Sequence, residues 1–328
     1  MKLQNNTWQH QLRDAFKSIP ELCDYLELNT IDIGSIQAQQ NFPLRVPKSF
    51  VENMEKGNPN DPLLKQVLPI NAELQTVAGF SDDPVGDLNA MTETGVIHKY
   101  HGRALLINTG SCAIHCRYCF RRNFPYNDYQ LSKQKQQNAL AYLQNHHEIK
   151  EVILSGGDPL LLSDNKLAEL ISAFNQIPHL KRIRIHSRLP IVLPARINKG
   201  LIDALTQSNK QIIMVVHCNH ANELSYEVSE VCQMMQLAGI KLLNQSVLLK
   251  DINDNVVELC RLSERLFEIG VMPYYLHLLD KAQGTAHFEV SRAEALSLME
   301  QVRARLSGYL VPKLVQEEAG ANGKTVVF

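Results

Sequence analysis

Three cysteines in one short segment of this 328-residue chain have the spacing of metal ligands: Cys112, Cys116 and Cys119. Thiolates separated by three and then two residues can converge on one iron–sulfur cluster from a single loop. Three protein ligands would leave one iron of a [4Fe–4S] cluster open, and an open iron can chelate the amino and carboxylate groups of a small molecule that then receives an electron. The alternatives are a zinc site, for which His115 could be the fourth ligand, and cysteines that bind no metal.

Near the end of the sequence, Lys324 stands in a loop of small residues, Gly-Ala-Asn-Gly-Lys-Thr. A lysine amine can form a Schiff base with pyridoxal phosphate where its surroundings favour the neutral amine. Taken alone, a solvated surface lysine is the commoner arrangement, because lysine is seldom buried. Lys324 is therefore a candidate cofactor lysine that needs support from other residues.

Polar residues recur where apolar runs of strand length end. Gly156, Gly157 and Asp158 follow one such run and offer open backbone groups and a carboxylate suited to an ammonium group. An ordinary turn that opens a helix has the same residue types. Later runs end at Ser187, His217, Gln245 and Asp280. Because the carboxyl ends of parallel strands form the ligand-binding face of α/β folds, this recurrence predicts one active site there.

The elements that must position these residues begin at about Arg103, where short apolar runs alternate with amphipathic segments of helix length. The predicted strands are residues 104–108, 151–154, 182–186, 212–217, 241–246 and 272–277. The predicted helices lie near residues 133–144, 165–174, 199–206, 224–238, 256–269 and 292–306. Repeated βα units with nearly continuous apolar strands predict a parallel sheet covered by helices, either an open doubly wound sheet or a barrel-like array.

The first hundred residues differ from the rest, because prolines interrupt their short helical stretches. We therefore expect three regions. Residues 1–98 form a mostly helical N-terminal region, residues 99–310 form the α/β region, and residues 311–328 form a C-terminal segment that carries Lys324.

The composition is that of a globular chain without a strong charge. Hydrophobic residues make up 45% of it, and 33 Lys and Arg against 34 Asp and Glu give a formal net charge of -1. No global field therefore attracts it to nucleic acid or anionic lipid, and no run approaches the roughly 20 apolar residues of a membrane span. The polar N-terminus and the odd number of cysteines, seven, favour a cytoplasmic protein with reduced thiols.

The cysteine spacing, with the aromatic Tyr118 before the last cysteine, resembles the motif of the radical S-adenosylmethionine (SAM) superfamily. Further segments resemble lysine 2,3-aminomutase in the same order along the chain: CRYCFRR (116–122), LSGGDPL (154–160), SRLPIVLPARI (187–197), NQSVLL (244–249) and PYY (273–275). The resemblance runs from about Pro62 to the C-terminus. Within that family, the short form is similar to the enzyme that supplies (R)-β-lysine for modification of bacterial elongation factor P.

This resemblance implies a partial (βα)6 radical SAM barrel and an isomerase that converts L-lysine to β-lysine. It also implies three cofactors: a [4Fe–4S] cluster, SAM and pyridoxal phosphate. In such an enzyme an electron from the cluster cleaves SAM to a 5′-deoxyadenosyl radical, which takes a hydrogen from C3 of lysine. The amino group, carried on pyridoxal phosphate, then moves from C2 to C3. The protein positions C3 and excludes competing hydrogen donors.

The resemblance further implies a role for each candidate residue. The cluster ligands are Cys112, Cys116 and Cys119. Pyridoxal phosphate is carried by Lys324, with Lys99, Tyr100 and Arg103 near its phosphate. The SAM-binding positions are Gly156, Gly157, Asp158, Ser187, His217 and Gln245.

Three residues are expected to bind the substrate. Arg121 matches the arginine that holds the substrate carboxylate, and Asp280 matches one of two acids that hold the ε-ammonium group. The second family acid is an aspartate, whereas this chain has Glu317 there, so its grip on free lysine differs from the family pattern.

The partners implied are L-lysine, an external electron donor and a ligase that transfers the product to elongation factor P. Neither nucleic acid nor a membrane is expected to bind directly. The chain ends four residues after Lys324, whereas longer family members continue into an extension associated with assembly, so we expect a smaller homo-oligomer.

Two other functions fit the residues. A radical SAM enzyme without pyridoxal phosphate would not need Lys324 for activity. A non-catalytic iron–sulfur or metal module would not consume SAM.

Overall fold

The computed structural model describes residues 7–29, 33–92, 95–126 and 133–327, and its centre is one nine-stranded sheet in which the strands follow chain order. The strands are β1 (Val96–Tyr100), β2 (Arg103–Thr109), β3 (Glu151–Gly156), β4 (Arg182–Ser187), β5 (Gln211–Val216), β6 (Lys241–Val247), β7 (Met272–His277), β8 (Lys313–Gln316) and β9 (Thr325–Val326). Strands β2 to β8 pair in parallel, and β1 and β9 add an antiparallel strand at either end.

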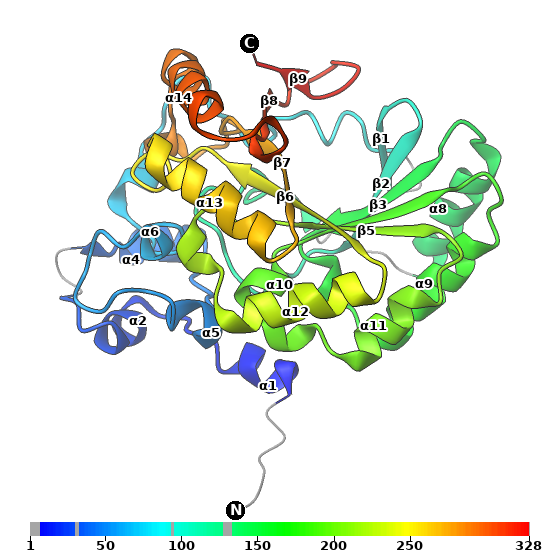
Figure 1. Cartoon of the computed structure of the whole chain (residues 1–328), viewed down its shortest axis with the longest axis horizontal. Helices are drawn as coiled ribbons and strands as arrows, with labels where there is room; N and C mark the ends of the chain where they lie inside the picture. Colours follow the sequence, from blue (N-terminus) through cyan, green and yellow to red (C-terminus); the bar gives the residue numbers. More distant parts are fainter. Residues whose placement is uncertain (1–6, 30–32, 93–94, 127–132, 328) are drawn as a thin grey trace, which may run out of the picture.

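A helix lies in each connection between successive parallel strands. These helices are α8 (Lys133–Asn145), α9 (Asp164–Asn175), α11 (Lys199–Thr206), α12 (Tyr226–Leu237), α13 (Val256–Glu268) and α14 (Arg292–Arg305). Figure 1 shows them on the outside of the curved sheet. All the strands and helices expected from the sequence are present, and the predicted partial (βα)6 barrel is confirmed.

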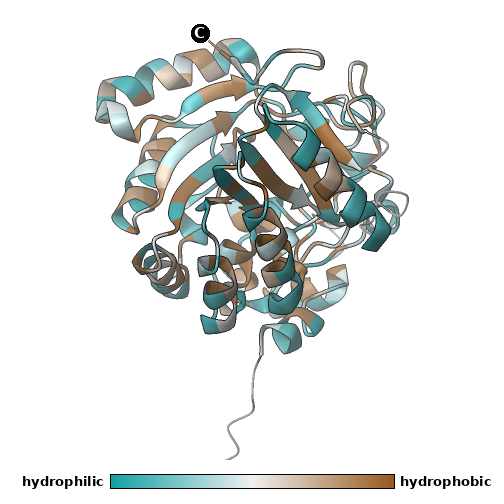
Figure 2. Cartoon of the chain, turned by 90° about the vertical axis from the view of Figure 1, so that its right-hand side faces the viewer, coloured by the Kyte–Doolittle hydropathy of each residue, from teal (hydrophilic) through white to brown (hydrophobic). Residues whose placement is uncertain are grey.

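The pattern of side chains along β4 explains why the sheet encloses a polar interior. Ile183 and Ile185 are fully buried on the helix side, whereas Arg184 and His186 line the inside of the barrel. Burying one such isoleucine contributes about 1.5–3 kcal/mol. In Figure 2 the strands accordingly carry brown, hydrophobic stretches, and the surrounding helices mix brown with teal. The outer face of the sheet therefore holds the fold together and leaves the inner face free for polar groups.

Helix α9 shows how the covering helices are defined locally. It begins after Ser163, whose hydroxyl accepts a hydrogen bond from the backbone N–H of Lys166. The residues that it buries recur at helical spacing: Leu167, Leu170, Ile171 and Phe174. The cap and the apolar stripe together fix where the helix begins and which face meets the sheet.

The N-terminal region is helical, as expected, and its helices are short. They are α1 (Trp8–Arg13), α2 (Ile19–Tyr25), α4 (Ile36–Asn41), α5 (Lys48–Val51), α6 (Pro62–Lys65) and the 3₁₀ turn η1 (Asn71–Leu74). Phe50 and Leu63 are fully buried in the same hydrophobic cluster as side chains of the barrel helices. This region therefore shares its core with the barrel, and the expected boundary between residues 98 and 99 falls inside β1.

Short helical turns fill several connections of the barrel. They are η2 (Pro159–Leu161), α10 (Leu189–Val192), η3 (Pro194–Arg196), η4 (Ala221–Glu223), η5 (Ala286–Phe288) and η6 (Gly308–Leu310). None of the described helices is long and apolar enough to cross a membrane.

The antiparallel strands at the two ends of the sheet were not expected from the sequence. β1 forms a hairpin with β2, in which Tyr100 pairs with Arg103. At the other end β9 pairs with β8, Val315 opposite Val326. Since Glu317 directly follows β8 and Lys324 directly precedes β9, this second hairpin brings the two side chains together.

Candidate active site

A cavity of about 710 Å³ occupies the inside of the curved sheet. Every site residue expected from the sequence lines it, from the three cysteines at the carboxyl ends of the strands to Lys324 in the C-terminal hairpin. The fold therefore collects into one space residues that lie far apart in the sequence.

The cysteines lie on the loop after β2. Among the described residues, the sulfur atoms of the three cysteines do not all lie within 4.8 Å of one another. Thiolates bound about 2.3 Å from one tetrahedral zinc would be about 3.8 Å apart. His115 is not placed as a fourth ligand, because its Nδ1 lies 2.8 Å from the carbonyl oxygen of Pro43. The arrangement fits an iron–sulfur cluster better than a single metal ion.

The protein alone does not favour the thiolate forms of Cys112 and Cys119. Burial and the neighbouring Cys119 raise the pKa of Cys112 well above its usual range, and burial with Cys116 raises the pKa of Cys119 to about 11. Ligation requires the thiolate, so a bound metal cluster must supply the free energy of deprotonation. The thiolate forms of Cys112 and Cys119 are therefore favoured only when a metal is bound.

One cation of the chain does reach the cysteines. Arg188 donates a hydrogen bond from Nη1 to Sγ of Cys116, at 2.8 Å, and is otherwise held by Gln66 and Glu223. Its side chain is only 5% exposed. Hydrogen bonds to cluster sulfurs set reduction potential, so Arg188 is placed to tune a bound cluster.

The N-terminal region fixes the cysteine loop through Glu73. This buried carboxylate of η1 pairs with Arg117 and, at 2.8 Å, with Arg122, the residues on either side of Cys119. Arg122 does not line the cavity and donates its other bonds to backbone carbonyl groups. Its position shows that the second arginine of the pair anchors the loop, leaving Arg121 alone to face the cavity.

Gly156 and Gly157 allow the end of β3 to pack directly on the cysteine loop. Gly156 has φ +118°, which side chains rarely adopt, and a Cβ on Gly157 would lie 2.2 Å from the carbonyl oxygen of Ser111. The backbone N–H of Gly157 donates to the Thr109 carbonyl at 2.7 Å. Both glycines are thus required by close backbone approach as well as by their place on the cavity wall.

Asp158 makes hydrogen bonds within the protein at the end of β3. Its two oxygens accept hydrogen bonds from the Ser187 hydroxyl and from the backbone N–H groups of Leu160, Arg188 and Leu189. A carboxylate offers about four acceptor sites, so these donors occupy it. With Ser187, Asp158 holds the turn that places Arg188, while it also lines the cavity, and the expectation that it binds SAM stays a prediction.

The opposite end of the cavity contains an alternating row of charges, of which Asp87 and Arg121 are buried and the others partly buried. Lys324 Nζ lies 3.0 Å from Glu317, whose other oxygen lies 3.3 Å from Lys99 Nζ. Lys99 in turn lies 2.6 Å from Asp87, and Asp87 lies 2.7 Å from Arg121 Nε. The row joins the expected pyridoxal lysine to the expected carboxylate-binding arginine through alternating ion pairs.

These ion pairs outweigh the effect of burial on each carboxylate. Burial works to raise the pKa of Asp87, but Arg121 and Lys99 hold that pKa below its usual value. Burial likewise opposes ionisation of Glu317, whose pKa is lowered by Lys324 and Lys99. Both carboxylates are therefore ionised near neutral pH.

The pKa of Asp280 is shifted in the opposite direction from those of Asp87 and Glu317. Burial raises its pKa to about 7, and although Lys324 opposes this shift, Glu317 and Asp87 add to it. No hydrogen bond to its carboxylate occurs among the described residues. Asp280 is thus a cavity-lining acid without a fixed cation, which suits an incoming ammonium group.

Tyr100 and Arg103 lie beside this row, near the start of β2. The Tyr100 hydroxyl donates to Glu317 at 3.0 Å, and the Arg103 guanidinium lies 4.4 Å from the centre of the Tyr100 ring. His277 Nε2 lies 3.2 Å from Lys324 Nζ on the other side. The lysine amine is therefore held between a carboxylate and a buried imidazole.

Several polar atoms of the cavity wall are buried without a partner. They include His217 Nε2 and Gln245 Oε1, both expected from the sequence to contact a cofactor, and His186 Nε2, which was not expected. Burial lowers the pKa of His217 to about 3, so its imidazole is neutral. Unpaired buried polar atoms are costly, and their concentration here indicates that a bound molecule supplies their hydrogen bonds.

Besides His186, the sequence did not assign Asp87 or Arg188 to the site. Asp87 lies in a loop before β1, and Arg188 directly follows the end of β4. Nothing local marks Asp87, because its two partners come from distant segments. Arg188 could have been found as a charged residue directly before an apolar segment, Leu-Pro-Ile-Val-Leu.

Comparison with known proteins agrees with this geometry. The radical SAM superfamily model matches residues 106–262, which include the cysteines and the cavity-lining ends of β3 to β6. An L-lysine 2,3-aminomutase of Escherichia coli is 48% identical over 320 residues, covering 97% of this chain and 93% of that protein. That of Haemophilus influenzae is 45% identical and covers 98% and 96%, respectively.

A more distant relative shows the same correspondence. The L-lysine 2,3-aminomutase of Clostridium subterminale is 34% identical over 325 residues, which cover 98% of this chain and 78% of that protein. The matches extend over both the cysteine loop and the hairpin of Lys324. On this similarity and on the site that it spans, the chain belongs to the lysine 2,3-aminomutase family of the radical SAM superfamily.

Proposed function

We propose that this protein is a pyridoxal phosphate-dependent radical SAM isomerase that converts L-lysine to β-lysine by moving the amino group from C2 to C3. One observation carries the proposal furthest: Glu317 binds the primary ammonium of Lys324 at 3.0 Å in the same cavity as Arg121 and Asp280. A free lysine presents the same ammonium group at one end and a carboxylate at the other.

The glutamate at position 317 is therefore compatible with lysine as the substrate. Its carboxylate accepts a hydrogen bond from the ammonium of Lys324, and this supports a role for the longer side chain in binding the ammonium group of the substrate. Once Lys324 is engaged by the cofactor, this oxygen is free for the ε-ammonium of the substrate. Asp280, without a fixed cation, supplies the second carboxylate.

Arg121 is the residue for the substrate carboxylate. Its Nε is held by Asp87 and its Nη1 by the Ser155 hydroxyl at 3.3 Å, so the planar group has a fixed orientation on the cavity wall. Burial works against its charge, but Asp87 raises its pKa above the usual value. A preset, permanently charged guanidinium favours bidentate binding of a carboxylate.

Residues at the two ends of the cavity are placed to hold the cofactors. When bound, the reduced cluster with SAM supplies the radical that takes hydrogen, and pyridoxal phosphate carries the migrating nitrogen. Cys112, Cys116 and Cys119 would hold the cluster, while His217 and Gln245 offer unpaired polar atoms to SAM. Lys324 would hold pyridoxal phosphate, and its phosphate would require cations.

The cations on the cavity wall near the expected phosphate come from β1, β2 and β4, and the one on β1, Lys99, is also paired with Asp87 and Glu317. Arg103 and Lys99 line the cavity, and Arg184 has a buried Nε without a partner. Arg184 thus joins the residues expected from the sequence. Because the site lies inside a curved sheet, the chain also shields a reactive intermediate from solvent and from competing hydrogen donors.

We further propose that the product is (R)-β-lysine and is passed to a ligase that modifies elongation factor P, that an external protein supplies the electron, and that the chain forms a small homo-oligomer. The support for these points is the likeness in sequence to the short members of the family.

The test is anaerobic reconstitution with iron and sulfide, followed by L-lysine, SAM, pyridoxal phosphate and a reductant. We expect β-lysine by mass spectrometry, with the migrating nitrogen retained when 15N at C2 is used. Lys324→Ala should bind the cluster normally but make no β-lysine. β-Lysine formation by this variant without added cofactor would overturn the pyridoxal role, and cleavage of SAM without any amino shift would favour a different radical enzyme.

A further inference from the structure

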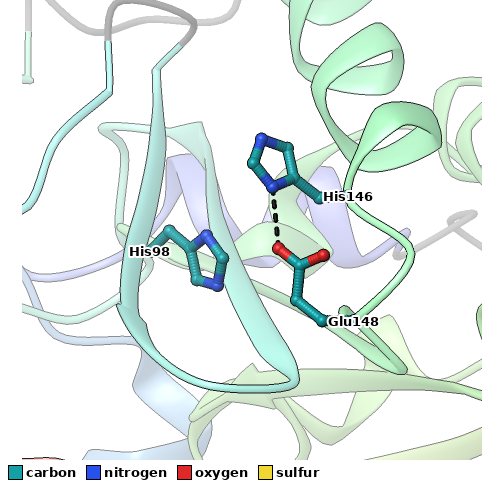
Figure 3. Close-up of side chains that lie close together, drawn as sticks. All are labelled: His98, His146 and Glu148. Atoms are coloured by element: carbon teal, nitrogen blue, oxygen red, sulfur yellow. Dashed lines mark hydrogen bonds and ion pairs between the residues drawn. The ribbon is translucent and has the colours of Figure 1, made fainter.

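A cluster of two histidines and one glutamate lies outside the residues used so far. His98 is on β1, and His146 and Glu148 follow α8. One ligand atom of each lies within 4.8 Å of the others, and no other such group of three histidines, cysteines or carboxylates occurs in the part of the chain that the structure describes. Figure 3 shows His98 facing the His146–Glu148 pair from the neighbouring strand.

The two imidazole rings have fixed orientations. Tyr142 of α8 places its hydroxyl 2.8 Å from Nδ1 of His98 and stacks its ring on that of His146, with ring centres 4.0 Å apart. His98 and His146 meet at 86°, and His146 Nδ1 lies 2.7 Å from Glu148. The cluster is therefore ordered by contacts from a residue that is not itself one of the three.

The cluster offers donor atoms of the kinds that transition metals take from proteins. They are two imidazole nitrogens and one carboxylate oxygen, gathered from two segments of the chain.

We propose that His98, His146 and Glu148 bind one divalent transition-metal ion, with Zn²⁺ as the ion that this ligand set suits. Imidazole nitrogen and carboxylate oxygen bind zinc at about 2.0–2.2 Å, and three protein ligands leave a position for water. The atoms are close enough that small side-chain movements would bring them to these distances. The oxygen-rich sites that Mg²⁺ and Ca²⁺ prefer have no such histidine pair.

The position of the cluster gives the ion a structural consequence. It would link the outermost strand β1 to the connection between α8 and β3, and so secure an edge of the sheet. Lys99 follows His98 directly on β1 and projects to the opposite side, into the active site. The ion would thus order the strand that presents Lys99 and Tyr100.

The test measures zinc and iron together in the reconstituted enzyme. Reconstitution fills the cysteines with iron, so zinc bound there is excluded and the iron content reports separately on the cluster. After exposure to Zn²⁺ and desalting, we expect about one zinc per chain by mass spectrometry of the metals. His98→Gln and Glu148→Gln should each lose most of it, with iron content unchanged.

His147→Gln is the matched control. His147 lies between the two ligands in sequence but stacks on His179, with ring centres 4.7 Å apart, and should retain the zinc. As a measurement independent of retention, Zn²⁺ should raise the melting temperature of wild type and of His147→Gln but not of His98→Gln. The site would be overturned if all four proteins bound the same amount of zinc and showed the same change in melting temperature on adding Zn²⁺. This outcome does not depend on enzyme activity.

Discussion

The carboxylate of Asp87 binds Arg121 at Nε, with a distance of 2.7 Å, and leaves the outer edge of the guanidinium facing the cavity. Its other oxygen lies 2.6 Å from Lys99. The buried side chain of Asp87, from a loop outside the barrel, therefore positions both Arg121 and Lys99. These two cations lie toward opposite ends of the expected substrate–cofactor complex. Asp87 acts as a positioning residue, since it orients the groups that bind and does not itself need to touch the substrate.

Asp87→Asn tests that role. The amide keeps the shape but removes the charge that orients Arg121, so the substrate carboxylate should be held in a less productive position. We expect kcat/KM for L-lysine to fall by about 10- to 100-fold. Asp82→Asn is the control, because Asp82 lies in the same loop and accepts a hydrogen bond from the exposed Asn123. Unchanged steady-state kinetics in Asp87→Asn would contradict the assignment.

Glu317 and Glu318 form a matched pair for testing substrate recognition. Glu317→Gln removes a charged acceptor of the ammonium group, which is worth about 1.5–3 kcal/mol. We therefore expect KM for L-lysine to rise by about 10- to 100-fold. Glu318→Gln should leave KM unchanged, since Glu318 accepts a hydrogen bond from Thr325 at the protein surface. Equal effects of the two substitutions would show a loss of hairpin structure instead.

The parts of this site that could be predicted from sequence are those encoded locally. The spacing of Cys112, Cys116 and Cys119 is a property of one loop, and the strands are visible as apolar runs. Polar residues at the strand ends could be assigned to one face because parallel strands all end on the same side. All of them line one cavity in the structure.

The ion pairs could not be predicted in the same way. Glu317 meets Lys99 only because β1 and the β8–β9 hairpin, at opposite ends of the sheet, approach across the barrel. Three of the four donors to Asp158 likewise come from residues 29 to 31 positions further on. Distant partners of this kind determine which acidic side chain is already paired within the protein and which can bind a ligand. Residue type and spacing in the sequence do not reveal these partners.

Arg188→Lys should change the electron affinity of the cluster. Arg188 donates to Cys116 Sγ at 2.8 Å, and a hydrogen bond to a cluster sulfur stabilises the added negative charge of the reduced state. Lysine keeps the charge but cannot reach Gln66, Glu223 and the sulfur together. We expect the midpoint potential to become more negative by roughly tens of millivolts, measured by an EPR-monitored titration. Arg182→Lys, half exposed at the start of β4, is the control; a shift of equal size there would contradict a specific bond.

We expect Asp280→Asn to stabilise the folded protein but to weaken the binding of L-lysine. The pKa of Asp280 is about 7 because burial raises it from 3.8, so between about pH 4 and pH 7 the folded protein holds a proton that the unfolded chain has lost. Stability therefore falls as pH rises through this window, by up to about 4 kcal/mol for a shift of this size. Asp280→Asn removes that penalty.

We accordingly expect cofactor-free Asp280→Asn to unfold at a higher urea concentration than wild type at pH 8, with a much smaller difference at pH 5. Its KM for L-lysine should nevertheless rise, because the uncharged amide no longer attracts the ε-ammonium group. Asp203→Asn, whose partner is Lys199 on the exposed surface of α11, should change neither quantity with pH. A stability gain that is the same at both pH values would mean that Asp280 is not the titrating group, because only a carboxyl that ionises inside this window links the gain to pH.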